Sequence, residues 1–185
     1  MRSGDWYVIQ IKTGREEAAC QDVVRACRRA GMANPDGRRL LAECFVPRYA
    51  SRRKMRGVWT DFATPLLPGY VVAVTDDPWE LARVLRGVPG FTKLLTLGET
   101  FAPLSKDDRQ WIDRWTKEGN RTIPMSMAYK EGNRIVVTEG PLTGYEAMIT
   151  RVNRRKCLAS VEIHAGSMTI HTTVGLSILP EPDYG

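Results

Sequence analysis

The chain has 185 residues, of which 27 are lysine or arginine and 21 are aspartate or glutamate, so its formal net charge is +6. Apolar residues make up 43% and charged residues 26% of it, which excludes a disordered tail and indicates a soluble protein with a buried core. No apolar run approaches the roughly 18 residues that cross a bilayer, and residues 1–17 lack the apolar core of a secretion signal. The four cysteines have no CxxC spacing, so we expect reduced thiols in a cytoplasmic protein without a metal or cofactor.

Positive charge is concentrated in the first two thirds of the chain. Residues 1–121 hold 21 basic and 15 acidic residues, a net charge of +6, whereas residues 122–185 hold six of each. Fixed positive charge attracts polyphosphate chains by releasing counterions, so a dense basic run indicates a nucleic-acid contact, with a solvated hairpin tip as the alternative. Such a run, uninterrupted by any acid, consists of Arg48, Arg52, Arg53, Lys54 and Arg56.

The first part of the chain has the pattern of an α+β fold, with helices packed on a mostly antiparallel sheet. Aromatic and β-branched residues predict strands, and apolar positions three or four apart predict helices. Gly31 ends the first helix, Asp77 and Pro78 begin the second, and Ser105 begins the third. In chain order we expect a strand at 6–11, a helix at 15–30, a turn at 34–37, a strand at 42–49, a hairpin tip at Arg56-Gly57, a strand at 66–74, a helix at 77–87, a strand at 91–97 and a helix from 105 with Trp111 and Trp115 on one face.

The last part of the chain has a different period. Residues 117–128 form a polar stretch that is broken by Gly119 and Pro124, which predicts a linker. From residue 129 apolar residues alternate at period two between turn residues, which predicts a small all-β barrel without a helix. The alternating pairs are Ile135 and Val137, Ala147 and Ile149, Val161 and Ile163, and Ile170 and Thr172.

The sequence offers little for catalysis. Its two histidines, His164 and His171, both fall on strand-like segments, where we expect no Ser-His-Asp or Cys-His set. The acidic pairs at 76–77 and 107–108 allow a metal-carboxylate interpretation, but each pair begins a helix, where capping explains it without a metal. No glycine-rich nucleotide loop is present. We therefore expect a binding protein and not an enzyme.

Four motifs follow one another along the chain. They are Trp6-Tyr7-Val8; Pro68-Gly69-Tyr70-Val71; Val88-Pro89-Gly90-Phe91 followed by Ala102-Pro103-Leu104-Ser105; and Glu131-Gly132-Asn133-Arg134-Ile135-Val136-Val137 followed by Gly140-Pro141-Leu142 and Gly144. In this order and spacing the chain resembles the bacterial NusG family of transcription factors. The resemblance implies an NGN domain over residues 1–118 that binds RNA polymerase, a linker over 119–128 and a KOW domain over 129–182.

Shorter motifs carry a finer resemblance. They are Thr13-Gly14-Arg15-Glu16-Glu17, Asn153-Arg154-Arg155-Lys156 and Val174-Gly175-Leu176. These segments resemble the LoaP branch of the family, whose members act as antiterminators on long biosynthetic operons. The resemblance implies a monomeric elongation and antitermination factor that suppresses pausing and termination. The alternatives are a general, housekeeping NusG whose KOW domain binds a termination helicase or a ribosomal protein, and a KOW-bearing protein of the ribosome.

The resemblance also implies which residues make contacts. The clamp coiled coil of RNA polymerase is expected to bind Trp6, Tyr7, Leu67, Pro68, Gly69, Tyr70 and Phe91. Non-template DNA is expected to bind weakly to Arg83 and Arg86, and the basic run adds Arg52, Arg53, Lys54 and Arg56. A nascent RNA hairpin is expected to bind Arg151, Asn153, Arg154, Arg155 and Lys156. Leu142 and Tyr145 match a loop that binds a protein partner. The alternatives are core packing for the apolar set and ordinary surface charge for the basic sets.

Overall fold

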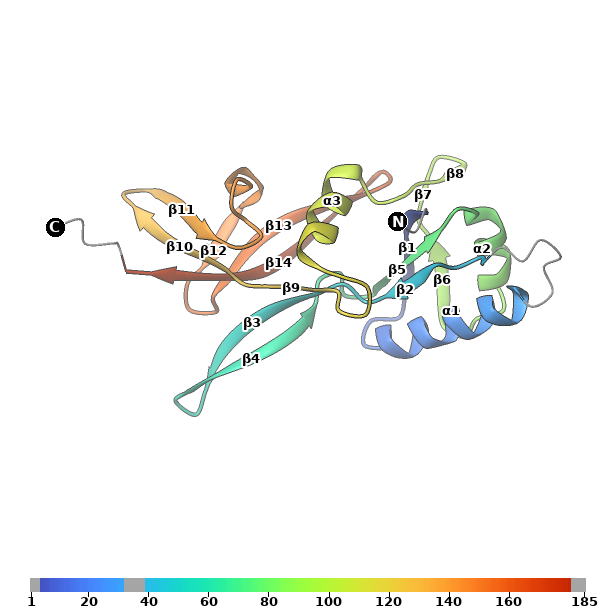
Figure 1. Ribbon diagram of the computed structural model, residues 1–185, viewed down its shortest axis with the longest axis horizontal. Helices are drawn as coiled ribbons and strands as arrows, with labels where there is room; N and C mark the ends of the chain where they lie inside the picture. The colour runs from blue at the N-terminus through green and yellow to red at the C-terminus, as the bar shows by residue number, and fades with distance from the viewer. Residues whose placement is uncertain (1–3, 32–38, 181–185) are drawn as a thin grey trace. The chain divides into compact units, whose positions relative to one another are not determined.

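The computed structural model describes residues 4–31 and 39–180, which form two compact units (Figure 1). The first unit comprises Met1–Pro47, Leu67–Gln110 and His164–Thr169, and the second comprises Arg48–Leu66, Trp111–Ile163 and Ile170–Gly185. Each unit therefore combines segments that are far apart in the sequence. The turn expected at 34–37 lies outside the described residues. None of the helices in the described ranges has the length and apolar character that a membrane span requires.

The first unit is an antiparallel sheet with two helices. Its elements are β1 (Asp5–Ile11), α1 (Glu16–Gly31), β2 (Glu43–Phe45), β5 (Tyr70–Thr75), α2 (Pro78–Leu85), β6 (Phe91–Leu94), β7 (Thr96–Leu97) and β8 (Thr100–Phe101). The main sheet has the order β2-β5-β1-β6, and β7 and β8 form a separate pair. Every neighbour in the main sheet runs antiparallel, with β1 held between β5 and β6. This confirms the predicted α+β architecture.

Alternation along β1 divides its side chains between the two faces of the sheet. Tyr7, Ile9 and Ile11 point to the face that α1 and α2 cover, and they share one apolar core with both helices. Trp6 and Val8 are buried on the opposite face. The helices contribute residues spaced three or four apart: Ala19, Cys20, Val23 and Cys27 from α1, and Leu81 and Leu85 from α2. Full burial of each larger aliphatic side chain stabilises the fold by about 1.5–3 kcal/mol, so this face holds the first unit together.

Local side chains fix the beginnings of α2 and of α3 (Lys106–Trp115). The Asp77 carboxylate accepts a hydrogen bond from the Glu80 amide at 2.9 Å, and the residue after Asp77 is a proline. At α3 the Ser105 hydroxyl oxygen accepts from the Asp108 amide at 3.1 Å. Each cap satisfies an amide that would otherwise lack a partner in the first helical turn. The predicted beginnings of both helices are confirmed.

The second unit consists mainly of strands. Its elements are β3 (Arg48–Met55), β4 (Val58–Pro65), β9 (Thr122–Ile123), β10 (Ser126–Glu131), β11 (Arg134–Glu139), the 3-10 helix η1 (Glu146–Met148), β12 (Arg151–Asn153), β13 (Leu158–Ala165) and β14 (Met168–Leu179). One sheet has the order β11-β10-β14-β13-β12 and the other the order β4-β3-β9. The alternating burial along β13 confirms the predicted period of two. The pairs β10–β14 and β3–β9 are parallel, which no local pattern indicates.

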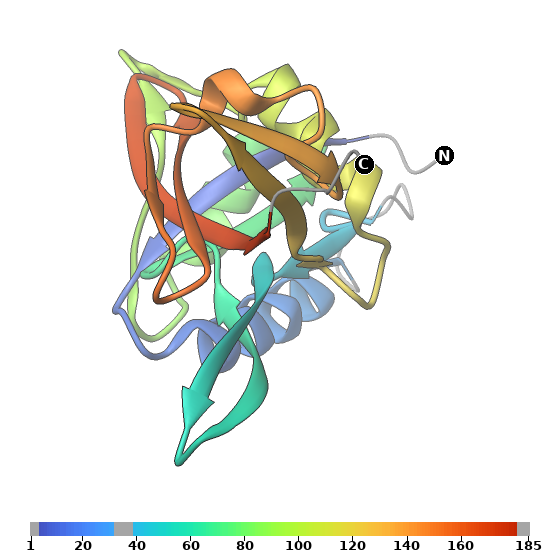
Figure 2. The ribbon, with the colours of Figure 1, turned by 90° about the vertical axis from the view of Figure 1, so that its left-hand side faces the viewer.

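The hairpin of β3 and β4 extends from the rest of its unit as a two-stranded ribbon (Figures 1 and 2), and we call it the arm. Its register is continuous from Arg48↔Pro65 to Met55↔Val58. Arg56 and Gly57 both have positive φ, at 48° and 89°, which is the two-residue turn that matches the twist of a hairpin. The hairpin tip predicted at this dipeptide is therefore confirmed.

Several predicted boundaries are wrong, each for a local reason. The strand expected at 42–49 is interrupted after β2, because Pro47 has no amide hydrogen for a sheet ladder. The strand expected from residue 66 begins only at Tyr70, after Gly69 with a φ of +83°. Ala147 lies in η1 and not in a strand, so the predicted absence of helix in this part is also wrong. The range 119–128, expected to be a linker, contains β9 and the first residues of β10.

Candidate functional site

A tight turn joins the arm to β5 and contains the Pro-Gly motif. Leu67 is fully buried, whereas the following Pro68 is exposed. The Gly69 amide donates a hydrogen bond to Oε1 of Glu16 at 2.8 Å, and the Gly69 carbonyl accepts one from the Ile11 amide at 2.9 Å. Glu16 is only 7% exposed although it carries a carboxylate. The buried carboxylate and the end of β1 thus hold this turn from two sides.

The residues predicted to bind polymerase do not share one surface. Trp6 and Tyr7 are consecutive on β1 and therefore point to opposite faces of the sheet. Tyr70 shares the face of Trp6, which packs edge-on against Phe45 with ring centroids 5.0 Å apart. Phe91 packs instead on the core under the helices. Trp6 and Tyr7 are buried, and Tyr70 and Phe91 are partly buried. Strand alternation forbids a pocket lined by all of them.

The tip between β13 and β14 contributes to the surroundings of Tyr70 within the first unit. The Tyr70 hydroxyl donates to Sδ of Met168 at 3.9 Å. The carbonyl of His164 accepts from the Ser105 amide at 2.9 Å, and the His164 amide donates to Oδ2 of Asp108 at 2.7 Å. Asp108 is buried, so its carboxylate anchors the backbone of the tip to the beginning of α3.

Ser105, Asp108 and His164 form a cluster that superficially suggests nucleophilic catalysis. Oγ of Ser105 lies 2.6 Å and Nδ1 of His164 lies 3.2 Å from the same oxygen, Oδ2 of Asp108. A catalytic triad requires the imidazole between the serine and the carboxylate, so that it can accept the hydroxyl proton. Here the carboxylate occupies the centre and both partners bond to it. The cluster caps α3 and provides no base for a nucleophile.

The arm carries the basic run expected to bind DNA. Nε of Arg52 lies 3.2 Å from Oδ1 of Asp61, and the Arg53 guanidinium stacks over the Phe62 ring at 4.4 Å from its centroid. Lys54 and Arg56 are exposed and have no ion pair within the described ranges. Two cations of the arm are therefore partly engaged by neighbours, and two others face solvent.

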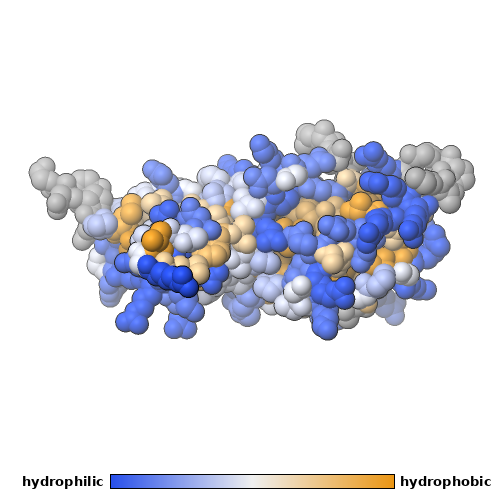
Figure 3. Space-filling view, turned by 90° about the horizontal axis from the view of Figure 1, so that it is seen from below, coloured by the Kyte–Doolittle hydropathy of each residue, from blue (hydrophilic) through white to orange (hydrophobic). Residues whose placement is uncertain are grey.

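The tip of the arm also exposes large apolar side chains that the sequence interpretation missed. Met55 is 54%, Val58 67% and Trp59 50% exposed. Seen from below, hydrophobic residues at the surface lie between strongly hydrophilic ones (Figure 3). Folding the sequence back at the Arg56-Gly57 turn would have shown that these residues lie at a hairpin end with no core to cover them.

The other arginines expected to bind DNA lie on α2. Nε and Nη2 of Arg83 donate to the two carboxylate oxygens of Glu80 at 2.6 and 2.5 Å. The hydrogen bond from Arg83 lowers the pKa of the Glu80 carboxyl. Arg86 is the exposed C-cap of the helix. On α2, Arg83 is thus held by Glu80 in a bidentate ion pair at the surface, and Arg86 faces solvent.

The residues expected to bind RNA come together at one hairpin. Arg151 and Asn153 lie on β12, and Arg154, Arg155 and Lys156 form the turn into β13. All five are exposed. Oδ1 of Asn153 accepts from the Lys156 amide at 3.1 Å, which shapes the turn. The turn thus presents four cations and one amide side chain to solvent.

The loop expected to bind a protein partner is tied into the second unit. Leu142 is fully buried, and its amide donates to Oγ of Ser126 at 3.0 Å. Nε1 of the buried Trp111 donates to the Pro141 carbonyl at 2.7 Å. Tyr145 is partly buried. Leu142 thus supports the loop from inside and does not present an apolar surface.

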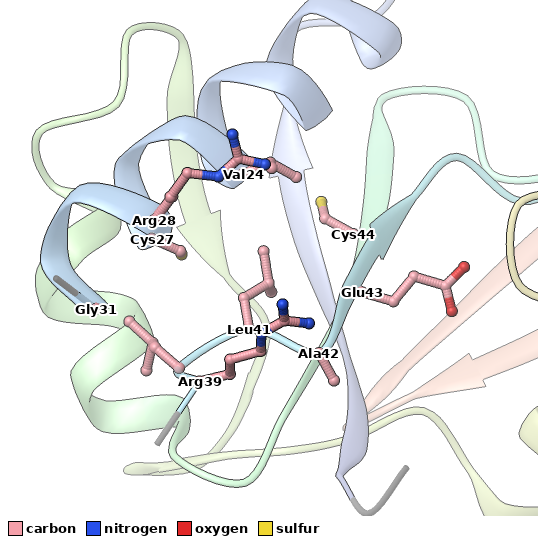
Figure 4. A pocket seen from close by; sticks show the side chains of 10 residues that line it. Val24, Cys27, Arg28, Gly31, Arg39, Leu41, Ala42, Glu43 and Cys44 are labelled. Atoms are coloured by element: carbon pink, nitrogen blue, oxygen red, sulfur yellow. The ribbon is translucent and has the colours of Figure 1, made fainter. Parts of the chain in front are cut away.

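A cavity of about 340 Å³ lies in the first unit between α1 and the segment that leads into β2 (Figure 4). Its lining includes Cys27 and Cys44, with Arg28 and Arg39. Burial, and then the charge of Glu80, raise the pKa of the Cys27 thiol to about 11. A hydrogen bond with Cys20, followed by burial, raises the pKa of Cys44 well above its usual value. Both thiols are therefore protonated at neutral pH and are poor nucleophiles.

Comparisons with known proteins place these features in context. The sequence model of a family described as "Transcription termination factor nusG" matches residues 4–113. The transcription termination/antitermination protein NusG of Lactococcus lactis is 26% identical over 85% of this chain and 83% of its own length. That of Vibrio vulnificus is 28% identical over 85% of each chain. A solved structure of Thermotoga maritima NusG covers 95% of this chain and 94% of its own, with a TM-score of 0.56 at 17% identity, which shows a shared fold.

Proposed function

Because this chain belongs to the NusG family, we propose that it is a transcription elongation and antitermination factor. In this proposal it binds RNA polymerase and suppresses pausing and termination; the name that its relatives share, transcription termination/antitermination protein, supports a role at termination. It carries out no reaction; its effect comes from binding more tightly to a polymerase state that does not pause.

The turn at Gly69, which two hydrogen bonds hold in place beside Tyr70, is the observation that supports a polymerase contact. An exposed Pro68 and a partly exposed Tyr70 stand next to each other at one end of the sheet. The buried carboxylate of Glu16 holds the intervening Gly69 amide. A rigid, partly apolar surface loses little conformational entropy on binding, and the tip of a helical coiled coil is a partner of suitable chemistry. We propose that the clamp coiled coil of polymerase binds here.

A binding assay with purified bacterial RNA polymerase tests this contact. Tyr70→Ala should weaken retention on polymerase by about ten-fold or more, as expected for loss of an aromatic residue at a binding hot spot. Trp79→Ala is the matched control, because Trp79 is 63% exposed on the same unit and lies outside the proposed surface. If the unmodified chain is not retained by polymerase at micromolar concentration, the proposed function is wrong.

We further propose that the hairpin turn of β12 and β13 binds a structured nascent RNA, which would restrict the factor to particular operons in the manner of the LoaP branch. Four exposed cations within six residues match the phosphates and splayed bases of a folded RNA. A gel shift with a folded leader hairpin should weaken clearly for the double variant Arg154→Ala, Arg155→Ala. Arg134→Ala, an exposed arginine on β11, is the control for charge alone. Equal binding by both variants would remove this part of the proposal.

A readthrough assay separates the specialised factor from a general one. A specialised antiterminator requires an RNA element in the leader of the transcript, whereas a general factor acts on any template. The burial of Leu142 supports the specialised role, because a loop without an exposed apolar residue gives a termination helicase or ribosomal protein little to bind. Readthrough that is independent of the leader would favour the general factor.

A further inference from the structure

The cavity of the first unit has the composition of a small-molecule site (Figure 4). Its volume of about 340 Å³ falls at the lower end of the range of ligand pockets, which are mostly apolar and contain a few polar groups. Raised pKa values keep its two thiols protonated, so much of the wall is uncharged. This uncharged part consists of Val24, Cys27, Leu40, Leu41, Ala42 and Cys44. It suits the hydrocarbon body of a ligand.

Two arginines add positive charge from the two segments that enclose the cavity. Arg28 lies in the last turn of α1, and Arg39 lies on the segment that leads into β2 (Figure 4). Both are exposed, and neither forms an ion pair within residues 4–31 and 39–180. Attraction to the negative end of the helix dipole accounts for Arg28, but Arg39 lies outside every helix and strand of the described residues. Glu43 also lines the cavity, and its carboxylate is directed away from both arginines (Figure 4).

We propose that this cavity binds a small organic anion, with its apolar body on the uncharged wall and its carboxylate or phosphate group between Arg28 and Arg39. Guanidinium groups donate charge-assisted, often bidentate hydrogen bonds to both kinds of anionic group. None of the lining residues belongs to the polymerase or RNA surfaces proposed above, so this site is independent of them. Because both thiols are poor nucleophiles, the ligand is bound without being modified.

Simpler ligands would use only half of the site. An inorganic anion would bind the arginines but leave the apolar wall in contact with water. A neutral apolar compound would cover the wall, but it would displace water from the guanidinium groups without replacing the lost hydrogen bonds. An anion with an apolar body satisfies both parts of the lining.

Fluorescence titration of the full chain with anilinonaphthalene sulfonate tests the proposal, because this probe joins an anionic group to an apolar body. Arg28→Ala and Arg39→Ala should each weaken its binding about 3- to 5-fold, as expected for loss of one exposed ion pair. Arg29→Ala is the matched control, because Arg29 is exposed in the same helical turn but does not line the cavity. Phenylnaphthylamine has the same body without the charge, and all three variants should bind it within about two-fold of the unmodified chain.

Competition identifies the class of ligand. Octanoate and phenyl phosphate each combine an anionic group with an apolar body, and at least one of them should displace the probe. Octanol lacks the anionic group and inorganic phosphate lacks the apolar body, so each should require at least about ten-fold higher concentration for the same displacement. Equal displacement by inorganic phosphate would show a site for simple anions and would overturn the proposal, as would displacement by neither organic anion.

Thiol alkylation shows where the probe binds. A saturating concentration of anilinonaphthalene sulfonate should slow the reaction of Cys44 with N-ethylmaleimide about five-fold or more, because Cys44 lines the cavity. Cys157 lies in the second unit, and its reaction should not change.

The proposal is overturned if Arg28→Ala and Arg39→Ala bind the probe as tightly as Arg29→Ala does. It is also overturned if the bound probe leaves the reaction of Cys44 unchanged, since the probe would then lie elsewhere, for example on the exposed Trp59. These assays contain neither polymerase nor nucleic acid, so a failure of the proposed function would leave their outcome intact.

Discussion

Removing the buried carboxylate of Glu16 should destabilise the turn at Gly69, which we propose as part of the polymerase-binding surface. In Glu16→Ala the Gly69 amide loses its acceptor at 2.8 Å. A buried donor left without a partner costs about 1–3 kcal/mol, and bonds to charged acceptors lie toward the upper end. The Gly69 carbonyl still accepts a hydrogen bond from the Ile11 amide at 2.9 Å, so the turn keeps its second attachment and the Gly69 amide stays beside the vacated position. We therefore expect a loss of about 2 kcal/mol in the free energy of unfolding.

Two further variants make this prediction specific. Glu16→Gln keeps an oxygen acceptor and should recover more than half of the lost stability. Glu17→Ala removes the same charge from an exposed position on α1 and should change stability by only about 0.5 kcal/mol. Urea unfolding followed by circular dichroism measures all three, and polymerase retention is measured well below the unfolding midpoint. If Glu16→Ala and Glu17→Ala unfold with the same free energy, Glu16 does not hold the turn.

Three shorter predictions test the local chemistry. Asp77→Ala leaves the Glu80 amide without its cap and should destabilise the chain by about 0.5–2 kcal/mol in thermal unfolding, and no change would refute the cap. Trp111→Phe removes the indole donor to the Pro141 carbonyl and should cost about 1–3 kcal/mol in urea unfolding; an unchanged midpoint would refute it. Burial raises the pKa of the Cys27 thiol to about 11 in the folded chain. The free energy of unfolding should therefore keep its full value below the usual thiol pKa and fall as the pH rises from about 9 to 11. Cys27→Ala should flatten that decline, and an equal slope in both proteins would contradict the buried thiol.

Features that depend on neighbouring residues could be predicted from the sequence. The α2 cap and the tip of the arm each rest on adjacent residues with a strong conformational preference, and both are found as expected. The apolar stripe of α1 likewise places Cys20 and Cys27 in one core. In these cases local preference and tertiary packing agree, which is why the pattern alone is sufficient.

Features that depend on distant pairing could not be predicted in this way. The parallel pairing of β10 with β14 joins residues about 50 positions apart, such as Ser126 with Leu176. The Leu142 amide bonds to Ser126, and the Glu16 carboxylate bonds to the Gly69 amide, so both contacts join residues that are distant in the sequence. A family motif identifies such residues without showing whether they face solvent or support those that do.

The division of the predicted polymerase residues between two faces leads to a final test. Tyr70 lies on the face away from the helices, and Phe91 packs on the core beneath them. A single coiled-coil tip can contact only one of these faces at this end of the sheet. Tyr70→Ala should therefore weaken polymerase binding, whereas Phe91→Ala should lower the stability of the first unit and leave the affinity of the folded protein unchanged. Affinities are compared at a temperature where circular dichroism shows both variants to be folded. Equal loss of affinity in both would mean that the contact surface wraps around the sheet edge at β6, and that Tyr70 is not its centre.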